Sequence, residues 1–332
     1  MIPTPGNGGT ESGLSLTLRP FDMQTPSSVW PPYHQPALKD QVLVFARETQ
    51  GLRVLVDATV GDGSHLEALL GVAPQNARFL ALDQDLEALE RAKSRLKAHP
   101  RFSDIVWKHA RFSSIPTVLD ELGWVEASWI LLDLGVSSLQ FDRAPRGFSF
   151  GKPGPLDMRM DPSVGQPASF LVNRLPEKEL ADILWSLGQE PRAKRIARAI
   201  IEARRVGPIE STTELAGIIQ KAVGRRAGFT KIHPATRSFM ALRIAVNDEL
   251  EELKKGLEGG VSRLQPCGRM VVISYHSLED GLVKRYFRSR DDGKILSKKP
   301  VRPTQEEVRS NPRSRSAKLR CFEKMGDSHD LV

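Results

Sequence analysis

Short apolar runs alternate with amphipathic stretches along two parts of the chain, residues 39–140 and 235–292. Each run is apolar in its interior and four or five residues long, which is typical of a parallel strand buried on both faces. The predicted strands are 53–57, 78–82, 104–107, 128–132 and 269–273. Because helical patterns separate these strands, the sequence predicts an α/β fold with a doubly wound, Rossmann-like sheet.

Helical patterns replace the strands between about Phe141 and Pro234. There, residues 191–205 place apolar side chains on one face and basic ones around the rest, which suits either a solvated surface or contact with nucleic acid. A single long helix is predicted over 235–257. The expected division is a tail at 1–32, a sheet domain at 33–140 and 235–292, an inserted helical domain at 141–234, and a basic C-terminal segment at 293–332.

Residues 1–32 are rich in Pro, Gly, Ser and Thr, and we expect them to be disordered. They lack the basic start and apolar centre of a secretion signal. No apolar run approaches the roughly 18–20 residues that span a bilayer, so no membrane partner is expected. The two cysteines have no spacing that suits a metal site or a disulfide framework, so the expected location is a reducing cytoplasm.

The formal net charge of +8 favours an acidic partner, most often nucleic acid. Most of the excess lies between Lys294 and Arg320, where nine basic residues stand against two acidic ones. A charge run of this kind either binds phosphates or remains a solvated tail.

A turn with two glycines, Gly61 and Gly63, follows the first predicted strand and precedes a helix. Such a turn needs glycine for its own geometry, and it also lets backbone N–H groups approach a ligand. Asp83 ends the next strand, where a carboxylate can bind the hydroxyls of a ribose. Leu66 stands where a dinucleotide-binding motif has Gly or Ala, which favours S-adenosylmethionine as the nucleoside cofactor. Asp57 either faces this ligand or caps the turn.

Asp133 ends the fourth predicted strand, at the edge where open α/β sheets place their chemistry. A charged loop rich in Gly and Pro follows and reaches Asp161. Loops longer than about 12–15 residues inside compact domains are usually functional or disordered, and the aromatic and Met residues here favour order. We expect the loop to face substrate, or else to form an interface or a flexible insertion.

A series of motifs follows in order along residues 33–324. They are His34-x-Pro36-x-Leu38, Asp57-Ala-Thr-x-Gly-x-Gly-x-His65, Asp83-Gln-Asp85, Asp133-Leu-Gly-Val-Ser-Ser-x-Gln140, Arg146-Gly-Phe-Ser-Phe150, Pro155-Leu-Asp-Met-Arg-Met-Asp161, a block over 234–250, Ile273-Ser-x-His-Ser-Leu-Glu-Asp280 and a block over 311–320. With them the chain resembles the bacterial MraW-type family, the S-adenosylmethionine-dependent methyltransferases that modify cytosine N4 in small-subunit ribosomal RNA.

The resemblance implies a methyltransferase sheet interrupted by a helical substrate-recognition domain. By motif position, the implied cofactor contacts are Gly63, Ser64 and His65 at the first turn, Asp83 at the ribose, Phe112 beside the adenine, and Asp133 with Gln140 near the methionine end. The family has Gly where Ser64 stands and Gln where Met240 stands; a serine amide still faces the ligand. Alternatively, His65 hydrogen-bonds local backbone, and His34 ties the N-terminal segment to the core.

The exocyclic amine of cytosine is a poor nucleophile, because its lone pair is conjugated with the ring. The enzyme must orient this amine towards the sulfonium methyl, and a carboxylate can accept the proton that leaves it. Asp133 is the first catalytic candidate, and His276 with Glu279, at another strand end, is the second. No cysteine nucleophile is needed, so Cys267 is expected to be inert. No His and Cys cluster occurs, and we expect no metal.

The expected partner is small-subunit ribosomal RNA, within an assembling or assembled subunit, and no sequence feature fixes the oligomeric state. RNA recognition is expected from the inserted helices and from Arg313, Arg315, Lys318 and Arg320, acting on an unstacked base. Two other functions stay open. One is methylation of a small molecule or protein, which would leave the basic regions unused. The other is a non-catalytic RNA-binding or assembly protein with a vestigial cofactor site.

Overall fold

The computed structural model describes residues 35–224 and 233–326, besides Met1. The expected disordered tail and His34 lie outside the described residues. The described residues from Gln35 onward belong to one compact unit. No helix among them is long and apolar enough to cross a membrane.

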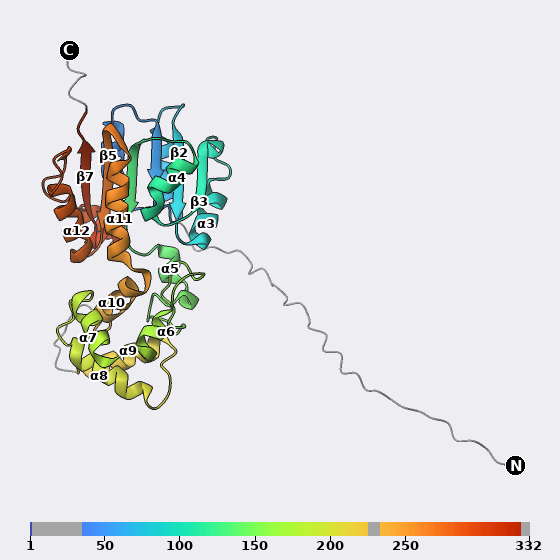
Figure 1. The fold of residues 1–332 in the computed structure, drawn as a ribbon, viewed down its shortest axis with the longest axis vertical. Coiled ribbons are helices and arrows are strands. Elements are labelled where there is room, and N and C mark those ends of the chain that lie inside the picture. Colours follow the sequence, from blue (N-terminus) through green and yellow to red (C-terminus); the bar gives the residue numbers. More distant parts are fainter. Residues whose placement is uncertain (2–34, 225–232, 327–332) are drawn as a thin grey trace. The chain divides into compact units, whose positions relative to one another are not determined.

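A seven-stranded sheet in the order β3-β2-β1-β4-β5-β7-β6 forms the centre of this unit (Figure 1). The strands are β1 Val54–Asp57, β2 Arg78–Asp83, β3 Ile105–His109, β4 Ala127–Asp133, β5 Leu264–Ser274, β6 Gly293–Ile295 and β7 Lys318–Lys324. Strands β1 to β5 are parallel, whereas β7 is antiparallel to both β5 and β6. The predicted doubly wound class is confirmed, in a mixed sheet with two strands more than the sequence indicated.

Alternate residues of the parallel strands pack against opposite layers of helices, as the period of two in a strand requires. One core joins Leu55, Phe79 and Leu131 to helices α1 Lys39–Arg47, α2 Ser64–Leu70 and α3 Leu86–Leu96. The other joins Val56 and Ile130 to helices α4 Ile115–Glu121, α11 Glu249–Ser262 and α12 Ser277–Arg288. Because both faces are covered, these strands are apolar throughout.

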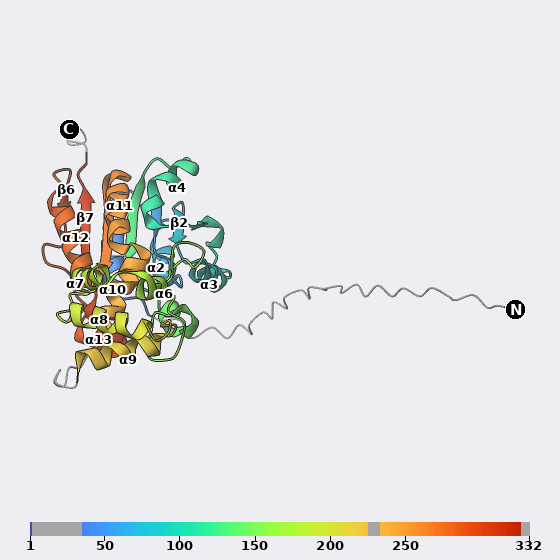
Figure 2. The ribbon, with the colours of Figure 1, turned by 60° about the horizontal axis from the view of Figure 1, so that its bottom comes forward.

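A third core lies in the helices beyond the carboxyl ends of the parallel strands (Figures 1 and 2). Its buried side chains include Leu184, Ile196, Ile219 and Leu242. The helices are α6 Ala168–Arg174, α7 Glu177–Ser186, α8 Ala193–Arg204, α9 Thr212–Val223 and α10 Thr236–Asn247, with the short α5 Ser138–Asp142 leading to them. Helix α10, which begins after residue 234, also takes part in this core. The domain boundary at 234 stays a prediction.

The single helix predicted over 235–257 is wrong, because the structure breaks it at Asp248. This residue has the left-handed φ of 51°, and it separates α10 from α11. Arg243 spans the break through two hydrogen bonds to the carboxylate of Glu249, at 2.7 and 2.8 Å. The break allows α10 to pack in the helical core while α11 covers the sheet.

The basic C-terminal segment is folded into the sheet domain. It contains β6, helix α13 Gln305–Ser310 and β7. The register places Ser274 opposite Lys318, so the chain enters β7 at the carboxyl end of β5. The alternative of a solvated tail therefore does not hold for residues 293–326.

Candidate active site

The strand order reverses between β1 and β4, the switch point of the sheet: β2 and β3 lie beyond β1 on one side, and β5 lies beyond β4 on the other. Open α/β sheets bind ligands in the crevice that this reversal creates at the carboxyl edge. Asp57 ends β1, Asp83 ends β2 and Asp133 ends β4. Tyr275 leaves β5 at the same edge. The sequence-predicted acids are thus brought together by parallel strands of matched register.

The glycine turn is built partly for packing. Gly61 and Gly63 have φ of 53° and 83°, which favour glycine, and a Cβ on Gly63 would lie 3.3 Å from the Cβ of Ala92 in α3. The N–H of Gly61 donates to Oδ2 of Asp83 at 2.8 Å. Asp83 therefore braces the turn, and burial raises its pKa to about 6. Each of its oxygens retains a second lone pair for a ligand.

Ser64, which replaces a glycine of the family pattern, is held by charged neighbours. Its hydroxyl donates to Oδ1 of Asp62 at 2.6 Å and accepts from Arg95 at 2.5 Å. Arg95 also pairs with Glu67 of α2. The side chain thereby points into this ion-pair network, and its backbone N–H stays at the first turn of α2.

A buried polar cluster joins Asp57, His65, Asp133 and Tyr275. The Tyr275 hydroxyl donates to Oδ1 of Asp133 at 2.9 Å, and Nε2 of His65 lies 3.5 Å from Oδ2 of the same carboxylate. Among the described residues, Oδ2 of Asp57 and both ring nitrogens of His65 have no hydrogen-bond partner. Burial raises the pKa of Asp57 to about 7, although nearby His65 opposes the shift. Burial and Asp133 likewise raise the pKa of Tyr275.

Both polar atoms of the Gln140 side chain form hydrogen bonds within the protein. Its Nε2 donates to Oδ2 of Asp85 at 2.7 Å, and its Oε1 accepts from the N–H of Ser137 in a capping box. Arg146 donates to the same Asp85 oxygen at 2.8 Å and to the carbonyl of Met160 at 2.8 Å. Asp85 and Arg146 stood in the sequence motifs without a role, and only their spatial meeting reveals one.

The charged loop that precedes α6 is built into the fold. Met158 and Met160 are buried, and Asn247 binds both. The Asn247 amide donates to the carbonyl of Met158 at 2.8 Å and accepts from the N–H of Met160 at 2.7 Å. At the loop's end, Asp161 lies 3.3 Å from Nε2 of His109, the last residue of β3. The loop thus closes over the edge that carries Asp83 and Asp85.

Phe112 lies on the β3 side of this edge, buried against α11. A Cβ on Gly256 would approach its ring to 2.4 Å, so this glycine makes room for the ring. Ser113 and Arg111, on either side of Phe112, both contact the carboxylate of Glu252. The ring is therefore fixed in place rather than free at the surface.

His276 and Glu279 form the capping box of α12, behind Tyr275. Oε2 of Glu279 accepts from the N–H groups of Tyr275 and His276, at 2.9 and 3.4 Å, while its Oε1 lies 3.0 Å from Nε2 of His276. The His276 pair and its hydrogen bond lower the pKa of this carboxyl against the effect of burial. Side-chain oxygens of Glu249 and Glu279 lie within 4.8 Å of the histidine ring, a spacing that suits a cation. Arg243 already neutralises Glu249.

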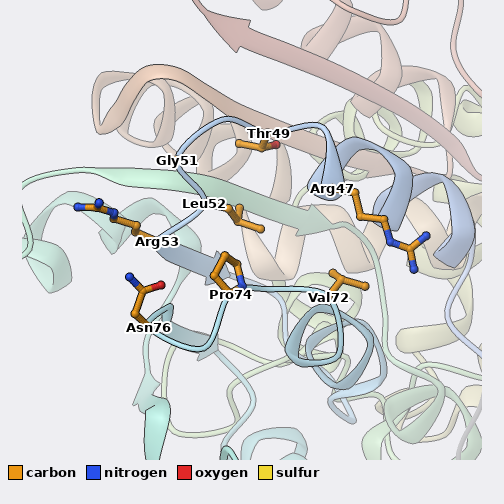
Figure 3. A pocket seen from close by; sticks show the side chains of 8 residues that line it. All are labelled: Arg47, Thr49, Gly51, Leu52, Arg53, Val72, Pro74 and Asn76. Carbon is orange, nitrogen blue, oxygen red and sulfur yellow. The ribbon is translucent and has the colours of Figure 1, made fainter.

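A hollow with a volume of about 350 Å³ lies at the opposite edge of the sheet (Figure 3). It is bordered by Leu52 and Arg53 before β1 and by Pro74 before β2. In Figure 3 the guanidinium groups of Arg47 and Arg53 point away from each other. The hollow therefore lies apart from the acids at the carboxyl edge.

A family model described as the MraW methylase family matches residues 32–325. The chain belongs to this family. A relative from Syntrophobacter fumaroxidans, named ribosomal RNA small subunit methyltransferase H, is 44% identical over 311 residues, which cover 88% of this chain and 97% of that protein. A relative of the same name from Pelobacter propionicus is 46% identical over 312 residues, which cover 88% and 98%.

Among solved structures, an rRNA methylase from Streptococcus thermophilus aligns over 89% of this chain and 99% of that chain, at 11% identity and a TM-score of 0.42. The assignment to the MraW methylase family rests on the sequence comparisons. As an MraW-family enzyme, the chain is a methyltransferase that uses S-adenosylmethionine.

The described residues of this MraW-family methyltransferase suit such a donor. Two positive-φ glycines and the start of α2 bring backbone N–H groups to the switch point. Carboxylates from three strand ends offer acceptors for ribose hydroxyls and for the cationic groups of S-adenosylmethionine. The orphaned atoms of Asp57 and His65 are buried polar groups of the kind that a polar ligand or water satisfies.

Proposed function

We propose that this chain methylates the N4 amine of a cytidine in small-subunit (16S) ribosomal RNA, within an assembling or assembled subunit in the cytoplasm. The observation that carries the proposal is the polar cluster at the switch point, where the Asp133 carboxylate accepts from a tyrosine hydroxyl and lies 3.5 Å from a histidine ring nitrogen. The names of the two relatives support the choice of ribosomal RNA as substrate.

The proposed cofactor contacts follow the order of elements along the sheet edge. Gly63, Ser64 and His65 present backbone at the start of α2, and Asp83 receives the ribose hydroxyls. Phe112 borders the adenine, and Gln140 fixes the segment beside the methionine end through Asp85. The bound donor supplies an electrophilic methyl group on a sulfonium.

Asp133 is proposed as the residue that accepts the proton of the amine. Its side chain is 22% exposed, so a substrate amine can reach it from the open side of the cluster. As the new N–C bond forms and the S–CH₃ bond breaks, the N4 proton moves to this carboxylate, which keeps electron density on the nitrogen. Glu279 already accepts backbone N–H groups, so we assign His276 and Glu279 to positioning Tyr275.

The test is methyl transfer from radiolabelled S-adenosylmethionine to small subunits and to naked 16S RNA, both taken from cells without this activity. We expect N4-methylcytidine on mass spectrometry of the digested RNA. Asp133→Asn should retain donor binding by calorimetry if Asp133 acts mainly on the amine, with methyl transfer reduced at least about a hundredfold. Label appearing only on protein or on small molecules would overturn the proposal, as would donor binding without any transfer.

A further inference from the structure

We propose that three exposed arginines at the carboxyl edge of the sheet, Arg302, Arg309 and Arg315, form a phosphate-binding rim for the RNA strand next to the target nucleotide. The inference rests on the proposed function, because it takes RNA as the substrate. We call these three residues the basic rim.

Strand register places the basic rim beside the candidate active site. Lys318 pairs with Ser274, the last residue of β5, and Val301 bridges to Leu319. Both ends of the segment 302–317 are therefore fixed at the carboxyl edge of β5. Tyr275, whose hydroxyl binds Asp133, leaves the sheet at this same edge.

The segment that carries the basic rim is a fixed platform. Glu307 of α13 accepts from the N–H of Leu38 at 2.7 Å, and Asn311 donates to the carbonyl of Gln35 at 2.9 Å. Ser314 is buried and bonds the carbonyl of Asn311 at 2.8 Å. Guanidinium groups on a rigid support lose less conformational freedom on binding than groups on a mobile tail.

Some basic side chains between Arg302 and Arg320 form ion pairs within the protein, and others do not. Lys318 and Arg320 both bind Asp280, at 3.1 and 2.7 Å, and Arg320 is buried. Arg313 forms an ion pair with Asp142, next to α5's Phe141. Lys318 and Arg320 therefore hold β7 to α12, and the RNA role expected for them from the sequence passes to other residues.

The three rim arginines are exposed, and none of them has a hydrogen bond or ion pair to another described residue. Each guanidinium can therefore give its donors to an external anion. A planar fork of donors matches the two oxygens of a phosphate, and a backbone that carries phosphates in series suits several such forks along one edge. Within α13, Glu307 accepts a hydrogen bond from Leu38, and Glu306 is the exposed acid. The three arginines of the basic rim therefore outnumber the exposed acid of this helix.

The experiment compares the rim variant R302Q/R309Q/R315Q with a control variant K97Q/K255Q/K284Q. The control removes the same charge from three exposed lysines, one just after α3 and the others on α11 and α12, that have no hydrogen bond or ion pair to a described residue. Binding of a 16S RNA transcript is measured by filter retention over a salt series. Each phosphate neutralised on a single strand contributes about 0.7 to the slope of log K against log salt, so the rim variant should lose about 2 from the wild-type slope.

Four further measurements make the result specific. Calorimetry should give the rim variant a wild-type affinity for S-adenosylmethionine, and R302K/R309K/R315K should recover most of the slope. A rim variant whose slope equals that of the control would overturn the proposal. So would weaker binding to assembled subunits with unchanged binding to naked RNA, because that points to a ribosomal protein. If the wild-type protein transfers no methyl group to RNA, the proposed function fails, whatever the rim does.

Discussion

Replacement of Asn247 by Ala should detach the charged loop from the fold. The Asn247 side chain is buried and donates to the carbonyl of Met158 while it accepts from the N–H of Met160. Both methionines are buried, so water does not reach the two freed backbone groups unless the loop moves. A buried polar group left without its partner costs about 1–3 kcal/mol. The expected loss in the free energy of unfolding is therefore roughly 2–6 kcal/mol if the loop stays.

If the loop detaches, water reaches the two freed backbone groups and the loss in unfolding free energy is smaller. Detachment would have two other measurable effects. The carbonyls of Arg159 and Met160 that Arg146 binds would move away, so the network around Asp85 would open. We expect Asn247→Ala to be cut rapidly by trypsin after Arg159 and to bind S-adenosylmethionine more weakly. Asn76→Ala is the control, because Asn76 is exposed and has no hydrogen bond among the described residues.

Urea unfolding, timed proteolysis and calorimetry together measure these effects. A change in unfolding free energy below about 0.5 kcal/mol, the range of ordinary surface substitutions, would refute the reasoning if proteolysis were also unchanged. The Asn247 hydrogen bonds would then be replaceable by local rearrangement.

Three other substitutions test the sheet edge. Tyr275→Phe removes the hydroxyl that binds the proposed catalytic carboxylate. A hydrogen bond to a charged group is worth about 1.5–3 kcal/mol, so kcat/KM in the methyl-transfer assay should fall roughly tenfold to a hundredfold. An unchanged kcat/KM would show that the Tyr275 hydroxyl plays no part in the reaction. Burial raises the pKa of Asp57 from its usual 3.8 to about 7, so the folded protein holds an extra proton between these values and its stability falls as pH rises through them. In urea unfolding at pH 5, 6 and 7, the free energy of unfolding of the wild-type protein should fall, relative to that of Asp57→Asn, by up to about 1.4 kcal/mol per pH unit. A difference between the two proteins that stays constant with pH would contradict this. Gly256→Ala should push the Phe112 ring from its place, lower the free energy of unfolding by about 1–3 kcal/mol and weaken donor binding in calorimetry. Its control is Gly217→Ala, which has open space around it and should be neutral or stabilising. Equal behaviour of the two variants would show that the ring adapts.

The parallel strands could be predicted because burial on both faces makes them continuously apolar. Strand β7 escaped detection, since charged and apolar residues alternate from Lys318 to Cys321 and two charged residues end the strand, so that it resembles a basic tail. The alternation has a structural cause, as Arg320 turns towards Asp280 while Leu319 and Cys321 enter the core. Only the pairing with β5, about fifty residues earlier in the chain, distinguishes such a strand from a tail.

The acids of the candidate site could be named from strand ends, because parallel strands carry their last residues to one edge. Their partners could not. Tyr275 and Asp133 are 142 residues apart, and Asn247 is 89 residues from Met158, so no local spacing signals either hydrogen bond. The break at Asp248 was hidden for a different reason. Apolar periodicity continues through it, because both α10 and α11 bury one face, although in different cores.

The place of β7 also bears on how the enzyme is made. Strand β6 meets the rest of the sheet through β7, which itself lies beyond every other described strand in the chain. During synthesis, β5 must therefore wait with an open edge, which is available to any other extended peptide. Only when residues 318–324 emerge can that gap be filled and the arginine-bearing platform take its position. A nascent or prematurely terminated polypeptide without residues 318–324 would consequently lack both the covered edge of β5 and the fixed platform.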